Sequence, residues 1–419
     1  MKKGLSFIIA LIILFINVIP ASAQEIPFTL ESEAVILIEE ETGKVLYEKN
    51  AYKRVYPAST TKILTALIAI EYLDPNEIIK VGNEVYSVPL DASKAGHNPG
   101  DEITLKDLLI SLLLPSGNDS AVVIASEVAR KTTGNENLDV NGSIAHFATI
   151  MNEKGKEFGL SNTNFVNPHG YHDDNHYSTA YDLATLTREA FKNPLFKEII
   201  KMSTAEIGTE GNEKEQKLSF KNRNLLLDSK NKDSYYPFAT GVKTGFTNEA
   251  GQCLVASAYK DGMSLIAVVL NNPTSDGRFN EAKALLEYGF QNFKFQNIVT
   301  EGETVTTVDV EKAALKGPSQ LELVAKTDYK GLLYKEDFSR VEKSVSLFDE
   351  VIIAPISKGQ IIGKITFTLD GENLGDVELI AKYDIEKRII LDLIFSIKAI
   401  PYWCGGIGVV FILSLIISA

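Results

Sequence analysis

The stretch Pro57-Ala58-Ser59-Thr60-Thr61-Lys62 opens the first helix that the apolar spacing predicts, over residues 59–73. A serine at a helix start is often an N-cap, but Lys62 argues against that role here. It falls in the first turn, where the helix dipole disfavours a cation by a few tenths to ~1 kcal/mol and a stabilising cap would carry glutamate. Three positions along a helix put Lys62 on the same face as Ser59. Because a serine hydroxyl needs a neighbouring base, the pair predicts a nucleophile, Ser59, and its base, Lys62.

Two further short motifs follow at wide spacing. Ser116-Gly117-Asn118 lies at a predicted turn between helices, and Lys243-Thr244-Gly245 precedes two late strands. Each alone is compatible with ordinary turn or edge-strand chemistry. Together with Ser59-x-x-Lys62, in this order, they form the three-element signature of penicillin-binding proteins and serine β-lactamases.

The elements around the motifs predict an α+β fold. Residues 34–38 and 44–47 are typical of a β-hairpin, and 252–258 and 263–270 of a second one. Further helices are expected over 105–114, 118–131 and 182–191. An early strand, central helices and late strands indicate one sheet assembled from both ends of a catalytic region, 24–292.

After this region the pattern of apolar and polar residues changes. Residues 296–383 alternate apolar and polar side chains, which predicts a small β-rich domain with a turn at Asp370-Gly371. Residues 384–398 repeat an apolar side chain every four positions, which predicts an amphipathic helix. Residues 399–419 carry no charge and would span about 31 Å as a helix, enough for a transmembrane anchor.

The N-terminus predicts export, and the composition argues against two other features. Lys2 and Lys3, an apolar run over 5–19 and Ala21-Ser22-Ala23 predict a signal peptide, residues 1–23. A net charge of −13 argues against nucleic acid as a partner. Two cysteines, Cys253 and Cys404, argue against a disulfide framework.

With these motifs the chain resembles the D-alanyl-D-alanine carboxypeptidases, low-molecular-mass penicillin-binding proteins of the S11 serine peptidase family. Other stretches carry the resemblance too: Asn167-Pro168-His169-Gly170, His176-Tyr177-Ser178-Thr179-Ala180, Asn222-Arg223-Asn224-Leu225-Leu226, Ala354-Pro355 and Lys358-Gly359-Gln360. The resemblance implies a β-lactamase/transpeptidase-like domain, an antiparallel sheet with a helical subdomain. It implies removal of the terminal D-alanine from peptidoglycan stem pentapeptides, inhibition by β-lactam antibiotics, no cofactor or metal, and a place on the outer face of the cytoplasmic membrane.

The resemblance also implies roles for the first two motifs. Ser59 would attack the carbonyl between the two D-alanines, and Lys62 would have to be neutral to act as base. Burial and a second cation lower a lysine pKa, and Lys243 is the natural candidate for that cation. Ser116 would relay a proton to the leaving amine, and Asn118 would hold the substrate amide or orient Lys62.

For the third motif the resemblance implies recognition of the substrate's ends. The backbone N–H groups of Ser59 and Phe246 would form the oxyanion hole. The Lys243-Thr244-Gly245 segment would bind the terminal carboxylate. Arg278 is a second candidate for that carboxylate, with a solvated surface charge as the alternative.

Other enzyme classes remain as alternatives at this point. A class A β-lactamase needs a Glu-x-x-Leu-Asn stretch between the second and third motifs, and Glu136-Asn137-Leu138-Asp139 does not supply it. Endopeptidase activity on cross-linked wall stays open. A binding protein without catalysis is disfavoured by the intact motif residues.

A metallopeptidase is the remaining alternative. His169, His172 and His176 stand near Asp173 and Asp174, which resembles metal-ligand spacing. The glycine and proline of the Pro168-His169-Gly170 segment break any helix that would align them.

Overall fold

The computed structural model describes residues 26–209 and 216–388 and divides the chain into two compact units between Gly289 and Phe290. The predicted signal peptide, 1–23, and the predicted transmembrane anchor, 399–419, lie outside the described residues. Within the described ranges, no helix combines the length and the apolarity that crossing a bilayer requires.

The first unit is built on a five-stranded antiparallel sheet in the order β2-β1-β9-β8-β7. The strands are β1 (Ala34–Glu39), β2 (Val45–Lys49), β7 (Ala239–Thr247), β8 (Gly251–Lys260) and β9 (Met263–Asn272). The first strand pairs with β9, so the prediction of one sheet assembled from both ends of the region is confirmed. Among the described residues, strand β7 is at the edge of this sheet.

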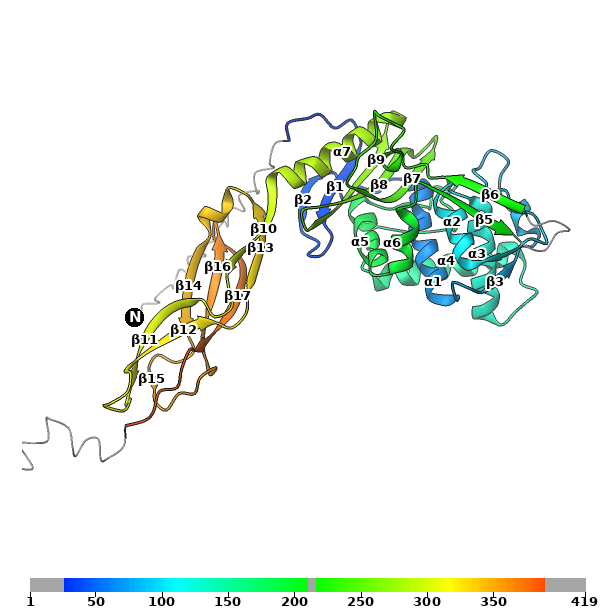
Figure 1. Cartoon of the computed structure of the whole chain (residues 1–419). Coiled ribbons are helices and arrows are strands. Elements are labelled where there is room, and N and C mark those ends of the chain that lie inside the picture. Colours follow the sequence, from blue (N-terminus) through cyan, green and yellow to red (C-terminus); the bar gives the residue numbers. More distant parts are fainter. Residues whose placement is uncertain (1–25, 210–215, 389–419) are drawn as a thin grey trace, which may run out of the picture. The chain divides into compact units, whose positions relative to one another are not determined.

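Helices cover both faces of this sheet (Figure 1). Helix α7 (Ser275–Asn292) lies on one face, where a Cβ on Gly289 would stand 2.5 Å from the Leu265 side chain. Helix α5 (Ala180–Phe191) contacts β1 and β9 from the other face. Every residue of β1 is therefore buried, and a strand covered on both sides has a continuous apolar sequence.

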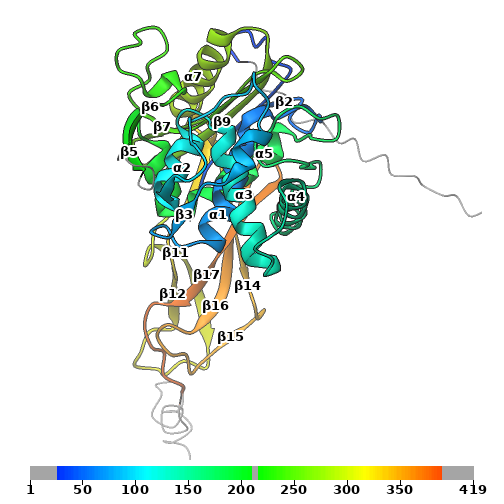
Figure 2. The same ribbon diagram turned by 90° about the vertical axis from the view of Figure 1, so that its right-hand side faces the viewer.

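The remaining helices form the subdomain beside the sheet (Figure 2). They are α1 (Lys62–Tyr72), α2 (Leu105–Leu113), α3 (Asn118–Thr133), α4 (Val140–Glu157) and α6 (Pro194–Ile200). Two small two-stranded sheets accompany them: β3 (Ile78–Lys80) with β4 (Glu102–Thr104), and β5 (Thr204–Thr209) with β6 (Gln216–Lys221). The sequence predicted α1, α2, α3 and α5, but not α4, α6 or α7.

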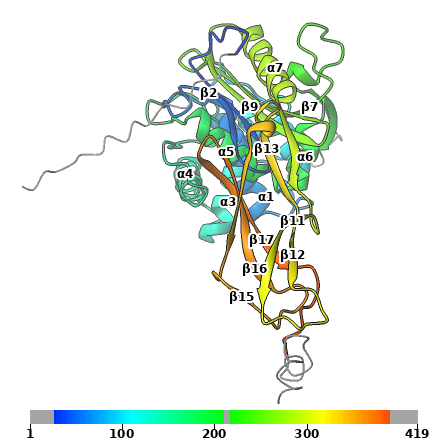
Figure 3. The same cartoon turned by 90° about the vertical axis from the view of Figure 1, so that its left-hand side faces the viewer.

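The second unit is a β domain with its own core (Figure 3). A six-stranded sheet has the order β14-β16-β17-β12-β11-β15, and β10 pairs with β13. The strands are β10 (Phe293–Val299), β11 (Thr304–Glu311), β12 (Gln320–Ala325), β13 (Tyr329–Tyr334), β14 (Glu342–Leu347), β15 (Ile352–Ile353), β16 (Ile361–Leu369) and β17 (Glu372–Ala381). The predicted turn at Asp370-Gly371 joins β16 to β17, with a positive φ at both residues.

The predicted amphipathic helix over 384–398 needs a correction at its start. Ile385 forms a β bridge with Ile356, and Lys387 forms one with Ala313. These backbone pairings hold residues 384–388 against the β domain, which a helical turn at that point would not allow. Residues 389–398 lie outside the described part of the chain.

Candidate active site

The predicted nucleophile lies in a 3₁₀ turn, η1 (Ala58–Thr61), directly before α1. Thr61, not Ser59, occupies the N-cap position of α1, and its side chain makes no capping hydrogen bond. Ala58 has a φ of +48°, which is uncommon for a residue with a side chain and marks local strain. Ser59 is therefore not the ordinary capping serine that its position in the sequence resembles.

Lys62 is fully buried and has three partners for its amine. Its Nζ lies 2.6 Å from Asn118 Oδ1, 2.8 Å from the His169 carbonyl oxygen and 3.0 Å from Ser59 Oγ. The first two partners can only accept hydrogen bonds. A neutral amine has two N–H groups and one lone pair, so with both N–H groups donated the lone pair faces the Ser59 hydroxyl.

The surroundings of Lys62 favour that neutral form. Burial lowers the pKa of Lys62 well below its ordinary value, the Arg223 guanidinium lowers it further, and Asp119 opposes them. The pKa of Lys243 is likewise lowered, first by burial and then by Lys62. The cation that lowers the pKa of Lys62 is Arg223, which the sequence did not predict, and not Lys243, the candidate that the sequence offered.

The second motif forms the turn from α2 into α3. Ser116 is buried, has a φ of +68° and faces the same cavity as Ser59. The Asn118 N–H donates to the Ser93 carbonyl at 2.9 Å. The Asp119 carboxylate accepts the N–H of Ala95 at 2.8 Å. These bonds hold the turn against the preceding loop, so Asn118 meets Lys62 from across the site.

The third motif lies on the edge strand β7. Lys243 is buried, and its Nζ donates to the Thr244 carbonyl at 3.0 Å. A Cβ on Gly245 would lie 3.0 Å from the Pro57 carbonyl oxygen and 3.1 Å from Ser59 N. Only glycine lets the strand approach this closely, and that approach places the backbone of Gly245 and Phe246 beside Ser59.

Arg278 is not a solvated surface charge. It lies in the first turn of α7, and its Nη1 donates to the Gly245 carbonyl at 2.9 Å and to the Cys253 carbonyl at 3.4 Å. Burial lowers the pKa of Arg278 to about 10. The guanidinium thus holds β7 and β8 at the site. Cys253 itself is buried and not in a disulfide, and burial raises its pKa to about 11.

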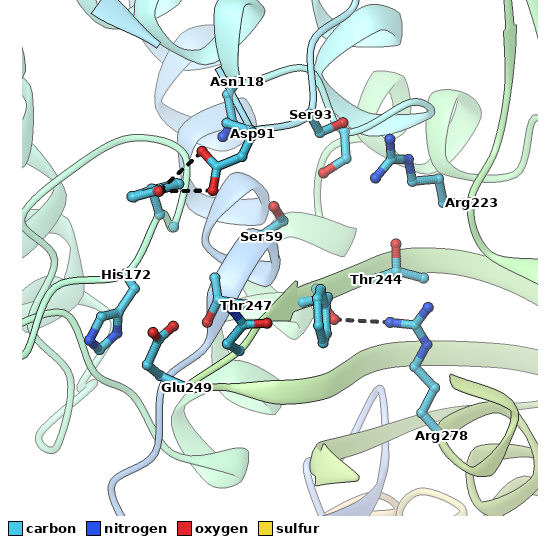
Figure 4. Close-up of a pocket in the computed structure, with 17 residues that line it drawn as sticks. Ser59, Asp91, Ser93, Asn118, His172, Arg223, Thr244, Thr247, Glu249 and Arg278 are labelled. Atoms are coloured by element: carbon cyan, nitrogen blue, oxygen red, sulfur yellow. Dashed lines mark hydrogen bonds between the residues drawn. The ribbon is translucent and has the colours of Figure 1, made fainter. Parts of the chain in front are cut away.

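A cavity of about 470 Å³ opens over Ser59 and has opposite charges at its two ends (Figure 4). Arg223 and Arg278 lie on one side of the serine. Asp91 and Glu249 lie on the other side. A ligand with a carboxylate at one end would therefore place that end near the arginines.

The sequence did not predict the roles of several residues in the site. Arg223 belongs to a stretch that carries the family resemblance, but no motif assigns it a role. No motif marks Asp91, which accepts from the Tyr171 hydroxyl at 3.2 Å. The His169 backbone carbonyl accepts a hydrogen bond from Lys62, and no side-chain pattern can predict a contact of a backbone carbonyl.

The three clustered histidines have separate partners. His169 Nδ1 accepts from Tyr171 N at 3.1 Å, His176 Nε2 meets the Thr61 hydroxyl at 2.8 Å, and His172 Nε2 lies 3.5 Å from Asp174 Oδ1. Across the described residues, no group of three His, Cys, Asp or Glu side chains is arranged to hold a metal ion. Their spacing in the sequence does not become a ligand set in space.

Comparisons with known proteins give consistent matches. Residues 20–274 match the family described as D-alanyl-D-alanine carboxypeptidase, and residues 293–387 match the family described as penicillin-binding protein 5, C-terminal domain. The chain is 35% identical over 361 residues to D-alanyl-D-alanine carboxypeptidase DacF of Bacillus subtilis (strain 168), covering 85% of this chain and 86% of that protein. It is 31% identical over 400 residues to D-alanyl-D-alanine carboxypeptidase DacC of Escherichia coli (strain K12), covering 92% of each.

Solved structures agree with these matches. Penicillin-binding protein 5 from Haemophilus influenzae superposes with a TM-score of 0.64 at 29% identity, covering 86% of this chain and 99% of that one. The Streptomyces K15 DD-transpeptidase superposes with a TM-score of 0.58 at 30% identity, covering 63% of this chain and 98% of that one.

Proposed function

This chain belongs to the D-alanyl-D-alanine carboxypeptidase family of S11 serine peptidases, and we propose that it removes the terminal D-alanine from peptidoglycan stem pentapeptides through an acyl-enzyme on Ser59. The observation that carries this proposal is the position of Lys62. Its buried amine donates to two obligatory acceptors and lies 3.0 Å from the Ser59 hydroxyl. This is the geometry that a base needs to take the serine's proton.

Acylation proceeds from this geometry. Ser59 Oγ attacks the carbonyl carbon between the two D-alanines while its proton passes to Lys62. The N–H groups of Ser59 and Phe246 hold the negative oxygen, and one such donor contributes about 3 kcal/mol of transition-state stabilisation. The C–N bond then breaks, and the proton reaches the leaving amine through Ser116, which opens onto the same cavity.

The carboxylate of the leaving D-alanine belongs at the cationic end of the cavity. Thr244 lines that end, with Lys243 buried beneath it and Gly245 shaping the strand. Arg223 opens into the cavity there and is a direct partner for the carboxylate. Arg278 supports this end indirectly, because its guanidinium donates a hydrogen bond to the Gly245 carbonyl. A water molecule then attacks the acyl-enzyme with Lys62 again as base, which releases the shortened peptide.

Export and membrane attachment complete the proposal. Residues 1–23 act as a signal peptide, residues 24–292 as the catalytic domain and 296–383 as a β-rich domain. Residues 399–419 act as an anchor on the outer face of the cytoplasmic membrane, preceded by amphipathic residues up to 398. The basic N-terminus, the small-residue cleavage site and the uncharged C-terminal run support this placement. Fractionation before and after removal of residues 399–419 tests it, with release from the membrane as the expected result.

The test of the activity is release of D-alanine from a peptide ending in D-Ala-D-Ala. The wild type should release it, and Ser59→Ala should not. A fluorescent penicillin should label the wild type and leave Ser59→Ala unlabelled. Activity that survives in Ser59→Ala but disappears with EDTA would instead indicate a metallopeptidase.

The lifetime of the penicilloyl adduct separates this proposal from a β-lactamase. A β-lactam should acylate Ser59 because it mimics the dipeptide. The resulting penicilloyl adduct should hydrolyse slowly. Rapid turnover of penicillin would overturn the carboxypeptidase assignment. Adding an amino-acid acceptor or cross-linked muropeptides to the same assay reveals transpeptidase or endopeptidase activity.

A further inference from the structure

The peptide group between Ala58 and Ser59 has an N–H and a C=O with separate roles. Its N–H is the Ser59 amide assigned above to the oxyanion hole. Its C=O accepts a 2.8 Å hydrogen bond from the hydroxyl of Thr61. Because a trans peptide group is planar, its C=O and N–H point in opposite directions. Whatever fixes the Ala58 carbonyl therefore fixes the direction of the Ser59 amide.

This peptide group needs outside support. Ala58 has a φ of +48°, a conformation that a residue with a side chain adopts only at an energetic cost. Gly170 packs against the same carbonyl, since a Cβ there would lie 1.8 Å from Ala58 O and 2.8 Å from Thr61 Oγ1. The carbonyl is thus held between the Thr61 hydroxyl and the Gly170 backbone.

A buried histidine sets the direction of the Thr61 hydroxyl. His176 Nδ1 accepts from the Val166 N–H at 3.2 Å, so in the neutral ring the proton is on Nε2. That Nε2–H lies 2.8 Å from Thr61 Oγ1 and donates to it. With its lone pair occupied in this way, the Thr61 hydroxyl directs its own proton to Ala58 O. The three hydrogen bonds form one chain, each with a fixed sense.

The histidine is itself held rigidly in a loop far from Ser59 in the sequence. Backbone hydrogen bonds in both directions join Asn164 to Tyr177 and Val55 to Ser178. The imidazole is 2% exposed and meets the Phe165 ring edge-on at 5.5 Å. Burial lowers the pKa of His176 to about 4, which keeps the ring neutral at neutral pH and agrees with the bonding pattern.

We infer that Thr61 and His176 are positioning residues for the oxyanion hole: the His176 Nε2–H orients the Thr61 hydroxyl, which holds the Ala58 carbonyl and thereby aims the Ser59 amide at the substrate oxygen. Neither side chain touches substrate in this arrangement. The inference rests on the proposed function and deepens it, because it names what makes one oxyanion donor rigid before the substrate arrives. Preorganised donors act without reorganisation at the moment of reaction.

Thr61→Val is the direct test, with Thr61→Ser as its matched control. Valine keeps the shape of the buried side chain and removes the hydroxyl, while serine keeps the hydroxyl. Removing a whole oxyanion donor costs about 10²–10³ in kcat, so misdirecting one should lower kcat roughly 10–100-fold. The KM for the peptide should stay within about threefold, since the donor acts mainly on the developing oxyanion. Thr61→Ser should stay within about threefold of wild type in both constants.

A peptide boronic acid supplies a readout that a merely structural role would not move. It forms a tetrahedral adduct on Ser59 whose oxygen occupies the oxyanion hole, as a transition-state analogue does. In Thr61→Val its Ki should rise by about the factor by which kcat/KM falls. Both Ki and KM are independent of how much of the sample is folded. A wild-type boronate Ki in a Thr61→Val protein would overturn the inference.

A double-mutant cycle tests the link between the two residues. His176→Leu removes the donor to Thr61 and should by itself raise the boronate Ki. Adding His176→Leu to Thr61→Val should have little further effect, because the chain of hydrogen bonds is already broken. Additive effects would mean that His176 does not act through Thr61, and would overturn that part. If Thr61→Val does not accumulate as folded protein, His176→Leu is measured alone against the same expectation. A wild type that neither releases D-alanine nor binds penicillin would overturn the proposed function instead.

Discussion

At the scale of single residues, the site depends on groups that change the state of Lys62. A lysine amine is a base only when deprotonated, and burial together with the Arg223 guanidinium lowers the pKa of Lys62. The acid limb of the pH profile of kcat/KM should therefore report Lys62. Activity should fall as the pH drops through that lowered pKa, because the amine then becomes protonated.

Replacing Arg223 should move this limb. Arg223→Gln removes a positive charge beside Lys62, so the pKa of Lys62 rises and the acid limb shifts to higher pH. The KM for a D-Ala-D-Ala peptide should also rise, about tenfold or more if a charged hydrogen bond to the carboxylate is lost. The measurement is kcat/KM against pH. Lys221→Gln is the matched control, since Lys221 pairs with Asp228 and does not line the cavity over Ser59. An unmoved acid limb in Arg223→Gln would contradict this account.

Substituting two glycines with nearly equal φ distinguishes the effect of a steric clash from the effect of backbone strain. Gly170 has a φ of +78° and Gly159 a φ of +75°. A Cβ on Gly170 would collide with Ala58 O at 1.8 Å, whereas nothing lies within 4 Å of a Cβ on Gly159. Gly159→Ala should cost about 1 kcal/mol of stability and no activity. Gly170→Ala should cost more and also lower the rate of penicillin acylation sharply. Urea unfolding and acylation kinetics measure the two effects, and equal behaviour of the variants would show that the contact is unimportant.

At the scale of elements, the loop carrying His169 and His176 forms the rear of the site. Burial lowers the pKa of His169 to about 3 and that of His176 to about 4. Their unfolded values lie near 6.5. A histidine whose pKa is lower in the folded state contributes stability that is present above pH 6.5. That stability is lost as the pH falls toward the folded pKa, because the unfolded chain binds the proton first.

The free energy of unfolding should therefore fall between pH 7 and pH 5. Each buried histidine contributes a loss of about 2 kcal/mol over that interval, from a slope of ~1.4 kcal/mol per pH unit. Urea denaturation at the two pH values should show a smaller loss in His176→Gln than in wild type. His146→Gln serves as the control, because His146 is a partly exposed residue on α4, outside this loop, and its substitution should leave the loss unchanged. Equal pH dependence in His176→Gln and wild type would exclude this role for the buried ring.

The elements also show where sequence patterns suffice. Helices α1, α2, α3 and α5 have apolar repeats, and the two hairpins have clear turns, so they were predictable. Helix α7 was missed because Gly277 and Gly289 weaken its helical signal. Gly289 is required by the close approach of Leu265, which is a property of the packed sheet and not of the helix. At α7 the local helix propensity is low, and tertiary packing determines that the helix forms.

At the scale of the whole molecule, the catalytic unit and the β domain each have their own core. The Streptomyces K15 enzyme, matched over 98% of its length by 63% of this chain, indicates that a catalytic unit can exist alone. A chain ending at Gly289 should therefore keep kcat/KM for a soluble D-Ala-D-Ala peptide within about threefold, as expected when distant units act independently.

The same truncated chain should lose activity on intact cell wall if the β domain acts as a spacer between the membrane and its substrate. The control is the full chain without residues 399–419, which keeps the β domain and lacks the proposed anchor. Release of D-alanine from wall sacculi, compared with release from soluble peptide, measures the difference. Undiminished activity of the truncated chain on wall would exclude the spacer role.

The sequence by itself determined which residues are proposed to carry the chemistry. Ser59, Lys62, Ser116-Gly117-Asn118 and Lys243-Thr244-Gly245 are short-range patterns, and their order along the chain was sufficient to predict the fold class. The sequence also places a lysine against the dipole of α1, and this unfavourable position is itself an indication of catalysis.

Only the tertiary structure decided how Lys62 works. Burial and the Arg223 guanidinium lower its pKa, and Asn118 from another helix and the backbone carbonyl of His169 orient its amine. The same holds for Arg223 and for the Thr61–His176 pair, whose members lie 115 residues apart. Burial and carbonyl contacts have no side-chain signature, because any residue has a carbonyl and burial arises only when distant segments pack. The proposed nucleophile and base could therefore be predicted from the sequence, but the packed arrangement around them could not.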